Sequence, residues 1–299
     1  PIEQFGADAV RYWAAAARLG LDATYDEGQM KIGRRLAIKL LNASKFALAI
    51  GREDENHHVG ETADAVWNPV DVTEPLDRAV MAKLALVIRQ ATDALNAYEH
   101  SKALEVIESF FWQFCDDYIE LVKNRAYGTA DAHGKVPSDA AVKSARTTLG
   151  LGLDAFARLL APYLPFATEE VWSWMHTGEG SVHRAAWPKA DIYAAAATGA
   201  SPETLAWAGK AVEQLRKIKS EAKVSMKTPI LSVTLAAVKD GIDAIKSALD
   251  DVAQAGRVIG KFDLAEKHAE EATAEGEGDD TVVIDASELG EPPAKKAKK

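Results

Sequence analysis

The sequence contains a single cysteine, Cys115, among its 299 residues. One thiol cannot form an internal disulfide and cannot supply the ligand set of a structural zinc site. No hydrophobic run approaches the roughly 20 residues that cross a bilayer, and the sequence carries no signal peptide. These absences exclude a disulfide-stabilised secreted domain and a membrane span. They favour a reducing, cytoplasmic setting with no membrane partner.

Catalytic signatures are absent as well. There is no Gly-rich loop of the P-loop or dinucleotide type and no Gly-x-Ser-x-Gly nucleophile elbow. Ser44 and Cys115 have no evident partner base, so neither is expected to act as a nucleophile. The adjacent His57 and His58 lack the i, i+4 spacing of a helical metal site, and a surface loop is the better interpretation. We expect no catalytic residue, metal or cofactor in this chain.

Length and composition favour a folded protein of more than one unit. A chain of 299 residues exceeds the usual size of one compact domain. Hydrophobic residues make up 47% and charged residues 27%, enough apolar material for a buried core. The sequence begins at Pro1 rather than methionine, and we expect it to be part of a longer polypeptide.

The charge distribution is uneven. A net charge of -10 argues against an indiscriminate nucleic-acid binder, and no DNA partner is expected. Residues 28–52 nevertheless carry six cations and no acidic residue: Lys31, Arg34, Arg35, Lys39, Lys45 and Arg52. A second run carries Lys210, Arg216, Lys217, Lys219, Lys223 and Lys227 against only Glu213 and Glu221. Two basic surfaces on an acidic background favour one specific anionic partner, with solvated helix faces as the alternative.

The first two-thirds of the sequence predict helices. Apolar residues recur at helical spacing over residues 8–18, 29–50, 76–98, 101–126 and 138–160. Ser101 and Ser138 are suitable N-caps, Asp8 is expected to cap or flank the first of these helices, and Thr168 is expected to restart a short helix after Pro165. Residues 52–75 are rich in Glu, Asp, Asn and His and predict a surface loop.

Beyond residue 178 the pattern changes. Residues 180–188 look extended, a helix is expected over 202–222, and strands are expected over 230–238, 261–266 and 281–286, with a helix over 241–255. The fold class predicted is mainly α, an antiparallel helical bundle followed by a small α+β unit. The expected divisions are 1–28, a linking segment; 29–178, the helical domain; 179–286, the α+β unit; and 287–299, a disordered Lys-rich tail.

The helix expected over residues 29–50 has two distinct faces. At about 100° per residue, Leu36, Ala37, Leu40, Leu41, Ala43, Ala47 and Leu48 form one apolar arc. Arg35, Lys39, Asn42 and Phe46 fall within about 60° of one another on the opposite side. An aromatic ring flanked by cations and an amide has the groups that bind single-stranded RNA: a stacking surface, phosphate partners and a hydrogen-bonding group. The alternative is that Phe46 packs under the following loop or against another domain.

The segment from Ala103 to Gly128 carries aromatic residues nearly all round a helix, so we expect it to be mostly buried. Its carboxylates Asp116, Asp117 and Glu120 superficially suggest acid–base catalysis. Without a positioned histidine or metal partner, pairing with Lys123 or other cations is the better interpretation.

Several segments resemble the C-terminal third of class I valyl-tRNA synthetases. "FGADAVRYWAAAARLGLDATYDEGQM" is similar to the segment after the KMSKS loop of that family, and "GRRLAIKLLNASKF" to the first long helix of its anticodon-binding domain. "ALEVIESFFWQFCDDYIELVKNRAYG", "APYLPFATEEVW" and "SVHRAAWP" resemble later parts of that domain, and "LRKIKSEAKVSMKTPI" the segment beyond it. An isoleucyl-tRNA synthetase is the alternative, but one cysteine cannot build the Cys-rich zinc element that many of its members carry.

The resemblance implies a function in tRNA recognition. In that family the anticodon arm lies on the helical domain, and the positions that match here are Lys39, Asn42 and Phe46, with Arg34, Arg35 and Lys45 beside them. It implies tRNA(Val) and a missing N-terminal catalytic domain as partners. ATP and Mg²⁺ would bind in that domain, so this chain alone would be inactive.

Two further expectations concern the rest of the chain. The sequence has no heptad repeats for the coiled-coil arm with which many bacterial members end. Arg216, Lys217, Lys219 and Lys223 are instead expected to meet the tRNA backbone. A helical protein-interaction module, with the Phe46 face docking a protein, is the rival hypothesis.

Overall fold

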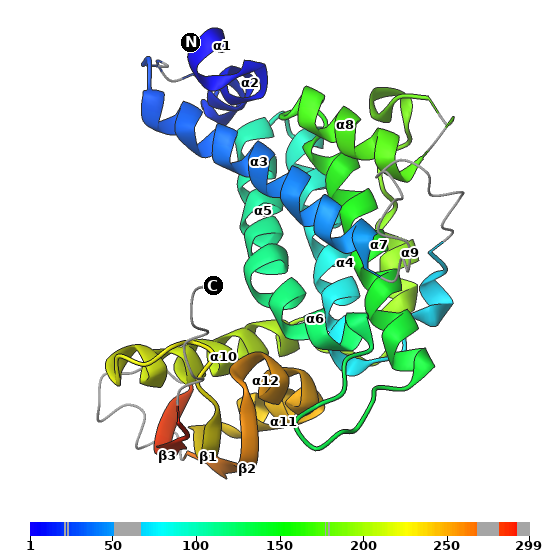
Figure 1. Ribbon diagram of the computed structural model, residues 1–299. Helices are drawn as coiled ribbons and strands as arrows, with labels where there is room; N and C mark the ends of the chain where they lie inside the picture. Colours follow the sequence, from blue (N-terminus) through cyan, green and yellow to red (C-terminus); the bar gives the residue numbers. More distant parts are fainter. Residues whose placement is uncertain are drawn as a thin grey trace, which may run out of the picture.

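The computed structural model describes residues 1–20, 22, 24–50, 67–176, 178, 180–267 and 281–291 (Figure 1). A helical bundle forms the larger part, and a small sheet with three helices packs at one end of it. The fold class predicted from the sequence is therefore confirmed. His57, His58, most of the loop expected over 52–75 and most of the Lys-rich tail lie outside the described residues.

Three N-terminal helices precede the bundle, and the third runs across one side of it (Figure 1). They are α1 (Ile2–Phe5), α2 (Ala7–Ala16) and α3 (Glu27–Ala49), and α3 packs on α2, α7 and α8. The Asp26 side chain caps α3 by accepting hydrogen bonds from the amides of Gly28 and Gln29. At Gly33, an added Cβ would lie 2.6 Å from Tyr12 Cβ, so a glycine is needed where α2 crosses α3.

The bundle contains α4 (Pro75–Asn96), α5 (His100–Gln113), α6 (Ile119–Tyr127), α7 (Asp139–Leu160), α8 (Pro165–Met175) and α9 (Ala190–Ala196). Short 3₁₀ turns cover Pro69–Asp71 and Val182–Arg184, the second within a segment expected to be extended. A π-helical turn, Phe114–Tyr118, joins α5 to α6 within the single helix expected there. Helices α2 to α8 agree with the predicted segments to within a few residues at most ends, whereas no helix was predicted at α1 or α9.

The predicted caps are only partly correct. Ser138 caps α7 by accepting from the Ala141 amide at 3.2 Å, as expected. Ser101 does not cap α5, which begins at His100, and Thr168 lies inside α8, which begins at Pro165. Asp8 lies in the first turn of α2 but caps a different helix, because its carboxylate accepts from the amides of Phe166 and Ala167 at the start of α8.

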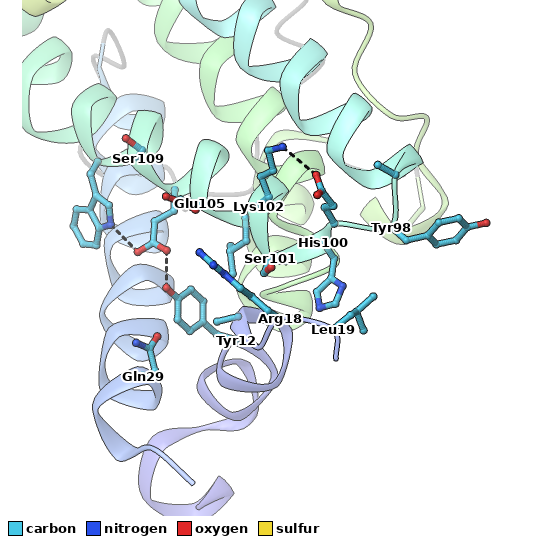
Figure 2. A pocket seen from close by; sticks show the side chains of 16 residues that line it. Tyr12, Arg18, Leu19, Gln29, Tyr98, His100, Ser101, Lys102, Glu105 and Ser109 are labelled. Atoms are coloured by element: carbon cyan, nitrogen blue, oxygen red, sulfur yellow. Dashed lines mark hydrogen bonds and ion pairs between the residues drawn. The ribbon is translucent and has the colours of Figure 1, made fainter. Parts of the chain in front are cut away.

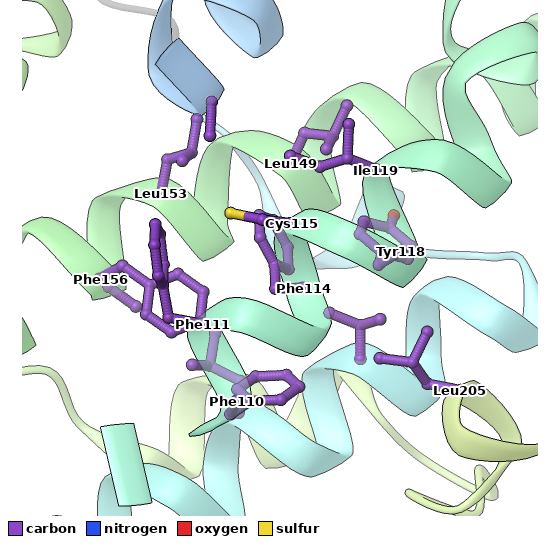
Figure 3. Packing of buried hydrophobic residues seen from close by; sticks show 14 of the residues in the cluster. Phe110, Phe111, Phe114, Cys115, Tyr118, Ile119, Leu149, Leu153, Phe156 and Leu205 are labelled. Carbon is purple, nitrogen blue, oxygen red and sulfur yellow. The ribbon is translucent and has the colours of Figure 1, made fainter. Parts of the chain in front are cut away.

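Aromatic side chains fill the centre of the bundle (Figure 3). The Phe156 ring on α7 lies 5.1 Å from Phe111 and 5.2 Å from Phe114, centroid to centroid, and all three rings are buried. Gly152 on α7 makes room for Phe114, since an added Cβ would lie 2.7 Å from its ring. The aromatic residues of this segment that face the bundle are thus buried, as expected, whereas Tyr127 near its end is exposed.

The C-terminal unit is a three-stranded sheet with helices between it and the bundle (Figure 1). Its elements are α10 (Thr204–Glu221), β1 (Ile230–Ala237), α11 (Lys239–Ser247), α12 (Leu249–Gly256), β2 (Val258–Glu266) and β3 (Val283–Leu289). β1 is central, parallel to β2 and antiparallel to β3. The single helix expected over 241–255 is divided at Ala248, which has non-helical backbone angles of φ -119° and ψ 20°.

A buried ionic network joins the two units. Arg125 on α6 donates to both carboxylate oxygens of Asp77 on α4, at 2.7 and 2.8 Å, and to both of Asp251 on α12, at 2.9 Å. Tyr118 and Ser144 donate to Asp77 at 2.8 and 2.6 Å. The Asp77 and Arg125 residues are 0% and 6% exposed. One buried guanidinium therefore binds a carboxylate from each of the two units.

Replacing this guanidinium should strongly destabilise the protein. Arg125→Met leaves two buried carboxylates without their cation, and we expect the free energy of unfolding to fall by about 3–5 kcal/mol in urea denaturation. Arg89→Met is the control, because Arg89 pairs with Asp191 on the surface. That variant should lose at most about 1 kcal/mol. Equal losses in the two variants would contradict the role of the network.

The same network should make stability depend on pH. Burial raises the pKa of Asp251 to about 6, although Arg125 opposes the shift. The folded protein therefore keeps this proton up to about pH 6, whereas the unfolded chain releases it near pH 4. The contribution of Asp251 to stability falls as pH rises across that interval. Urea denaturation from pH 4 to 7 should show the wild-type free energy of unfolding decreasing relative to Asp251→Asn up to pH 6. A pH-independent difference would refute this.

Candidate RNA-binding surface

The exposed face of α3 carries most of its cations. Arg34, Arg35, Asn42 and Lys45 are exposed, whereas Leu36, Leu40 and the other residues of the predicted apolar arc are buried or half-buried. Arg34 donates to the Gln4 carbonyl at 3.1 Å, and Lys45 Nζ lies 5.4 Å from the centroid of the Trp174 ring. Arg35, Lys39, Asn42 and Phe46, here named the α3 strip, lie along the side of α3 that leans toward α5 and α6.

The first half of the α3 strip contacts α5. Arg35 Cζ and Lys39 Nζ lie 5.7 and 6.0 Å from the centroid of the Trp112 ring. Lys39 is half-buried and its Nζ forms an ion pair of 2.6 Å with Asp116. Partial burial disfavours the Lys39 charge, but the hydrogen bond and negative charge of Asp116 raise its pKa above the usual value. Lys39 is therefore a constrained cation, and Arg35 is the more accessible one.

Phe46 occupies the border between surface and core. Its ring is half-buried and packs partly against the bundle. The Tyr127 ring on α6 meets it edge-to-face, with centroids 6.0 Å apart and planes at 75°. Lys123 Nζ lies 5.4 Å from the Phe46 centroid. The predicted ring is thus neither fully exposed nor sealed in the core.

Two of the three carboxylates in and after the π-helical turn pair with cations, as expected. Asp116 binds Lys39, and Glu120 lies 3.9 Å from Lys123. Asp117 faces α10, where an added Cβ on Gly209 would lie 2.9 Å from its carboxylate. Burial and the neighbouring Asp116 raise the pKa of Asp117.

The second basic run is only partly available to a ligand. Arg216, Lys217 and Lys223 are exposed, and α10 packs on the π-helical turn beside the α3 strip. Lys219 was expected to meet the tRNA backbone, and this expectation is wrong. It is 2% exposed, and its Nζ donates to the carbonyls of Met226 and Gly256 at 3.2 and 2.8 Å. Burial lowers its pKa to about 8, and nearby Arg257 and Arg216 act in the same direction.

A groove of about 1070 Å³ between α2 and α5 adjoins the α3 strip at Trp112 (Figure 2). Glu108 organises its wall by accepting from Tyr12 Oη at 2.6 Å and from Trp112 Nε1 at 3.1 Å. The lining includes charges of both signs, among them Arg18, Lys102 and Glu105. The groove is therefore lined by mixed charges, whereas the exposed charged residues Arg34, Arg35 and Lys45 of the α3 face are all positive.

Sequence reasoning missed three side chains of this surface: Trp112, Lys123 and Tyr127. All three lie on the aromatic segment that was expected to be mostly buried. Trp112 is half-buried, and Lys123 and Tyr127 are exposed. Lys123 was identified only as a partner for carboxylates. A usable signal was the i, i+4 spacing of Lys123 and Tyr127, which places both on one side of a helix.

Cys115, the single thiol of the sequence, is buried. Burial raises the pKa of Cys115 to about 12, which keeps its thiol protonated and unreactive. Within the described ranges, no group of three His, Cys, Asp or Glu side chains is placed to hold a metal ion. None of the helices in this part of the chain is long and apolar enough to cross a membrane.

Comparison with known families identifies the family of the chain. Residues 77–235 match the family described as the anticodon-binding domain of tRNA ligase, which is more than half of the chain. The chain therefore belongs to this family of tRNA ligases.

Three curated relatives show which tRNA ligases the chain is similar to. The chain is 82% identical to the valine–tRNA ligase of Bifidobacterium longum (strain NCC 2705) over its full length, 49% identical to that of Thermobifida fusca over 86%, and 43% identical to that of Cutibacterium acnes over 99%. It spans 33%, 27% and 30% of these proteins, about a third of each. A solved LeuRS–tRNA–LeuAMS complex from Agrobacterium radiobacter K84 aligns with 89% of this chain and 29% of that one at a TM-score of 0.43 and 14% identity.

The burial of Cys115 can be tested directly. We expect the folded protein to resist modification by a disulfide reagent such as DTNB at pH 8, because the thiol is buried and protonated. In guanidinium chloride the same sample should react rapidly at its one thiol. Rapid reaction of the folded protein would show that Cys115 is accessible.

Proposed function

We propose that this chain is the anticodon-reading part of a valine–tRNA ligase and that it binds tRNA(Val) through the anticodon arm. The relatives that support this assignment carry the name valine–tRNA ligase at up to 82% identity. In the proposed whole enzyme, a separate catalytic part binds ATP and Mg²⁺ and attaches valine to the tRNA in the cytoplasm. The present chain contributes recognition and no catalytic residue.

One structural observation carries the proposal: the α3 strip places cations, an amide and an aromatic ring along one side of the helix, with Arg35 and Asn42 exposed and Phe46 half-buried. Arg35 meets phosphate, and Asn42, which is exposed, reads the edge of an unstacked base. The Phe46 ring provides a stacking surface. Lys39 contributes positive potential from its ion pair with Asp116 rather than as a free cation. Arg34 and Lys45 extend the basic face around the helix, toward Gln4 and Trp174 respectively.

The basic run on α10 extends the contact toward the tRNA backbone. Arg216 and Lys217 on α10 and Lys223 just after it are exposed cations suited to that contact. Lys219 is excluded from this role because its Nζ is bound to two carbonyls inside the C-terminal unit.

A protein-docking module remains the rival hypothesis, since a half-buried aromatic ring also suits a protein interface. The salt dependence of binding distinguishes RNA binding from protein docking. Binding to RNA should weaken steeply with rising salt, because each neutralised phosphate releases counterions. The experiment is a gel-shift titration of the 299-residue chain with a tRNA(Val) transcript and an anticodon-swapped transcript at several salt concentrations.

In that titration, Phe46→Ala should weaken tRNA(Val) binding by a few-fold to about a hundredfold, the range expected for losing one stacking contact. Phe166→Ala removes an exposed ring at the start of α8, outside the α3 strip, and serves as the control. It should leave the affinity unchanged. Wild-type affinity in a folded Phe46→Ala protein would count against the α3 strip, and equal binding of both transcripts would count against anticodon reading.

A further inference from the structure

Tyr127 is the more exposed of the two rings at the end of the α3 strip. It is 48% exposed, whereas Phe46 is half-buried. The planes of the two rings are inclined at 75°, so their faces point in different directions. A single flat base cannot stack on both, but two neighbouring bases splayed apart can each use one ring.

A cation accompanies this pair of rings. Lys123 lies one turn before Tyr127 on α6, and its Nζ is 5.4 Å from the Phe46 centroid. Its side chain is 45% exposed and only weakly held by Glu120, at 3.9 Å. The ammonium group is therefore close enough to the Phe46 ring to meet the phosphate beside a base stacked there.

The backbone that carries Tyr127 is firmly fixed. Two residues earlier, Arg125 binds Asp77 and Asp251 inside the protein. Gly128 ends α6 in the left-handed conformation, with φ 70°, and its amide donates to the Arg125 carbonyl. A ring held on a fixed helix end loses little backbone freedom on binding, which favours affinity.

We propose that Tyr127 is a second base-stacking residue and that Lys123 binds the phosphate beside it. The ligand is a pair of adjacent unpaired nucleotides, one base on Phe46 and the next on Tyr127. This assignment rests on the proposed function of the chain, and it adds α6 to a surface otherwise assigned to α3 and α10.

The test uses the 299-residue chain and the tRNA(Val) transcript in gel-shift titrations. Tyr127→Leu keeps bulk beside Phe46 but removes the aromatic face, and it should weaken binding by about 5- to 100-fold. Tyr127→Phe retains the face and should bind within about twofold of the wild type. Lys123→Met should reduce the slope of log affinity against log salt by about one. Thermal unfolding of each variant confirms that it folds.

The outcomes separate this proposal from the proposed function. Phe46→Leu is the matched variant: if it weakens binding while folded Tyr127→Leu binds like the wild type, Tyr127 does not stack and the proposal is overturned. Equal losses in Tyr127→Phe and Tyr127→Leu would assign the effect to the hydroxyl and would also overturn it. If Tyr127→Leu fails to fold, the other two variants decide. Tight binding by Tyr127→Phe, together with a smaller slope of log affinity against log salt in Lys123→Met, supports the proposal. An unchanged slope in Lys123→Met overturns the proposal. Failure of the wild-type chain to prefer tRNA(Val) over the anticodon-swapped transcript would overturn the proposed function itself, and this assignment with it.

Discussion

The arrangement of this protein depends on one buried guanidinium. Arg125 lies between carboxylates from the bundle and from the C-terminal unit, and its donors engage both. Burial raises the pKa of Asp251 and the guanidinium opposes that rise, while the negative charge of Asp77 adds to it more weakly. Because the same helix carries Lys123 and Tyr127 on its outer side, the ion pairs that join the units also fix the surface proposed to meet RNA.

The sequence was sufficient to predict most helices and the outline of the α3 surface. Apolar residues at a period of 3.6 identify a buried face wherever they occur, and α3 buries Leu36 and Leu40 as that pattern requires. The same wheel placed Phe46 among polar neighbours. It did not reveal that Tyr127 and Lys123 approach Phe46, because those contacts join residues distant in the sequence.

Two of the errors originate in tertiary contacts. Lys219 belongs to a basic run and was therefore expected at the surface, yet two carbonyls from separate segments converge on its ammonium group. Asp8 has the correct residue type for a cap, but the helix that it caps lies far along the chain. Local sequence patterns identify which groups can form hydrogen bonds. They do not identify distant partners.

The π-helical turn at Phe114–Tyr118 determines the direction in which the side chains of α6 point around the helix axis. Such a turn accommodates one extra residue, and one residue corresponds to about 100° of rotation. Removing that residue would turn α6 about its own axis, carrying the guanidinium away from its carboxylates and the tyrosine ring away from α3. The length of this turn, in addition to the identity of its residues, is therefore under constraint.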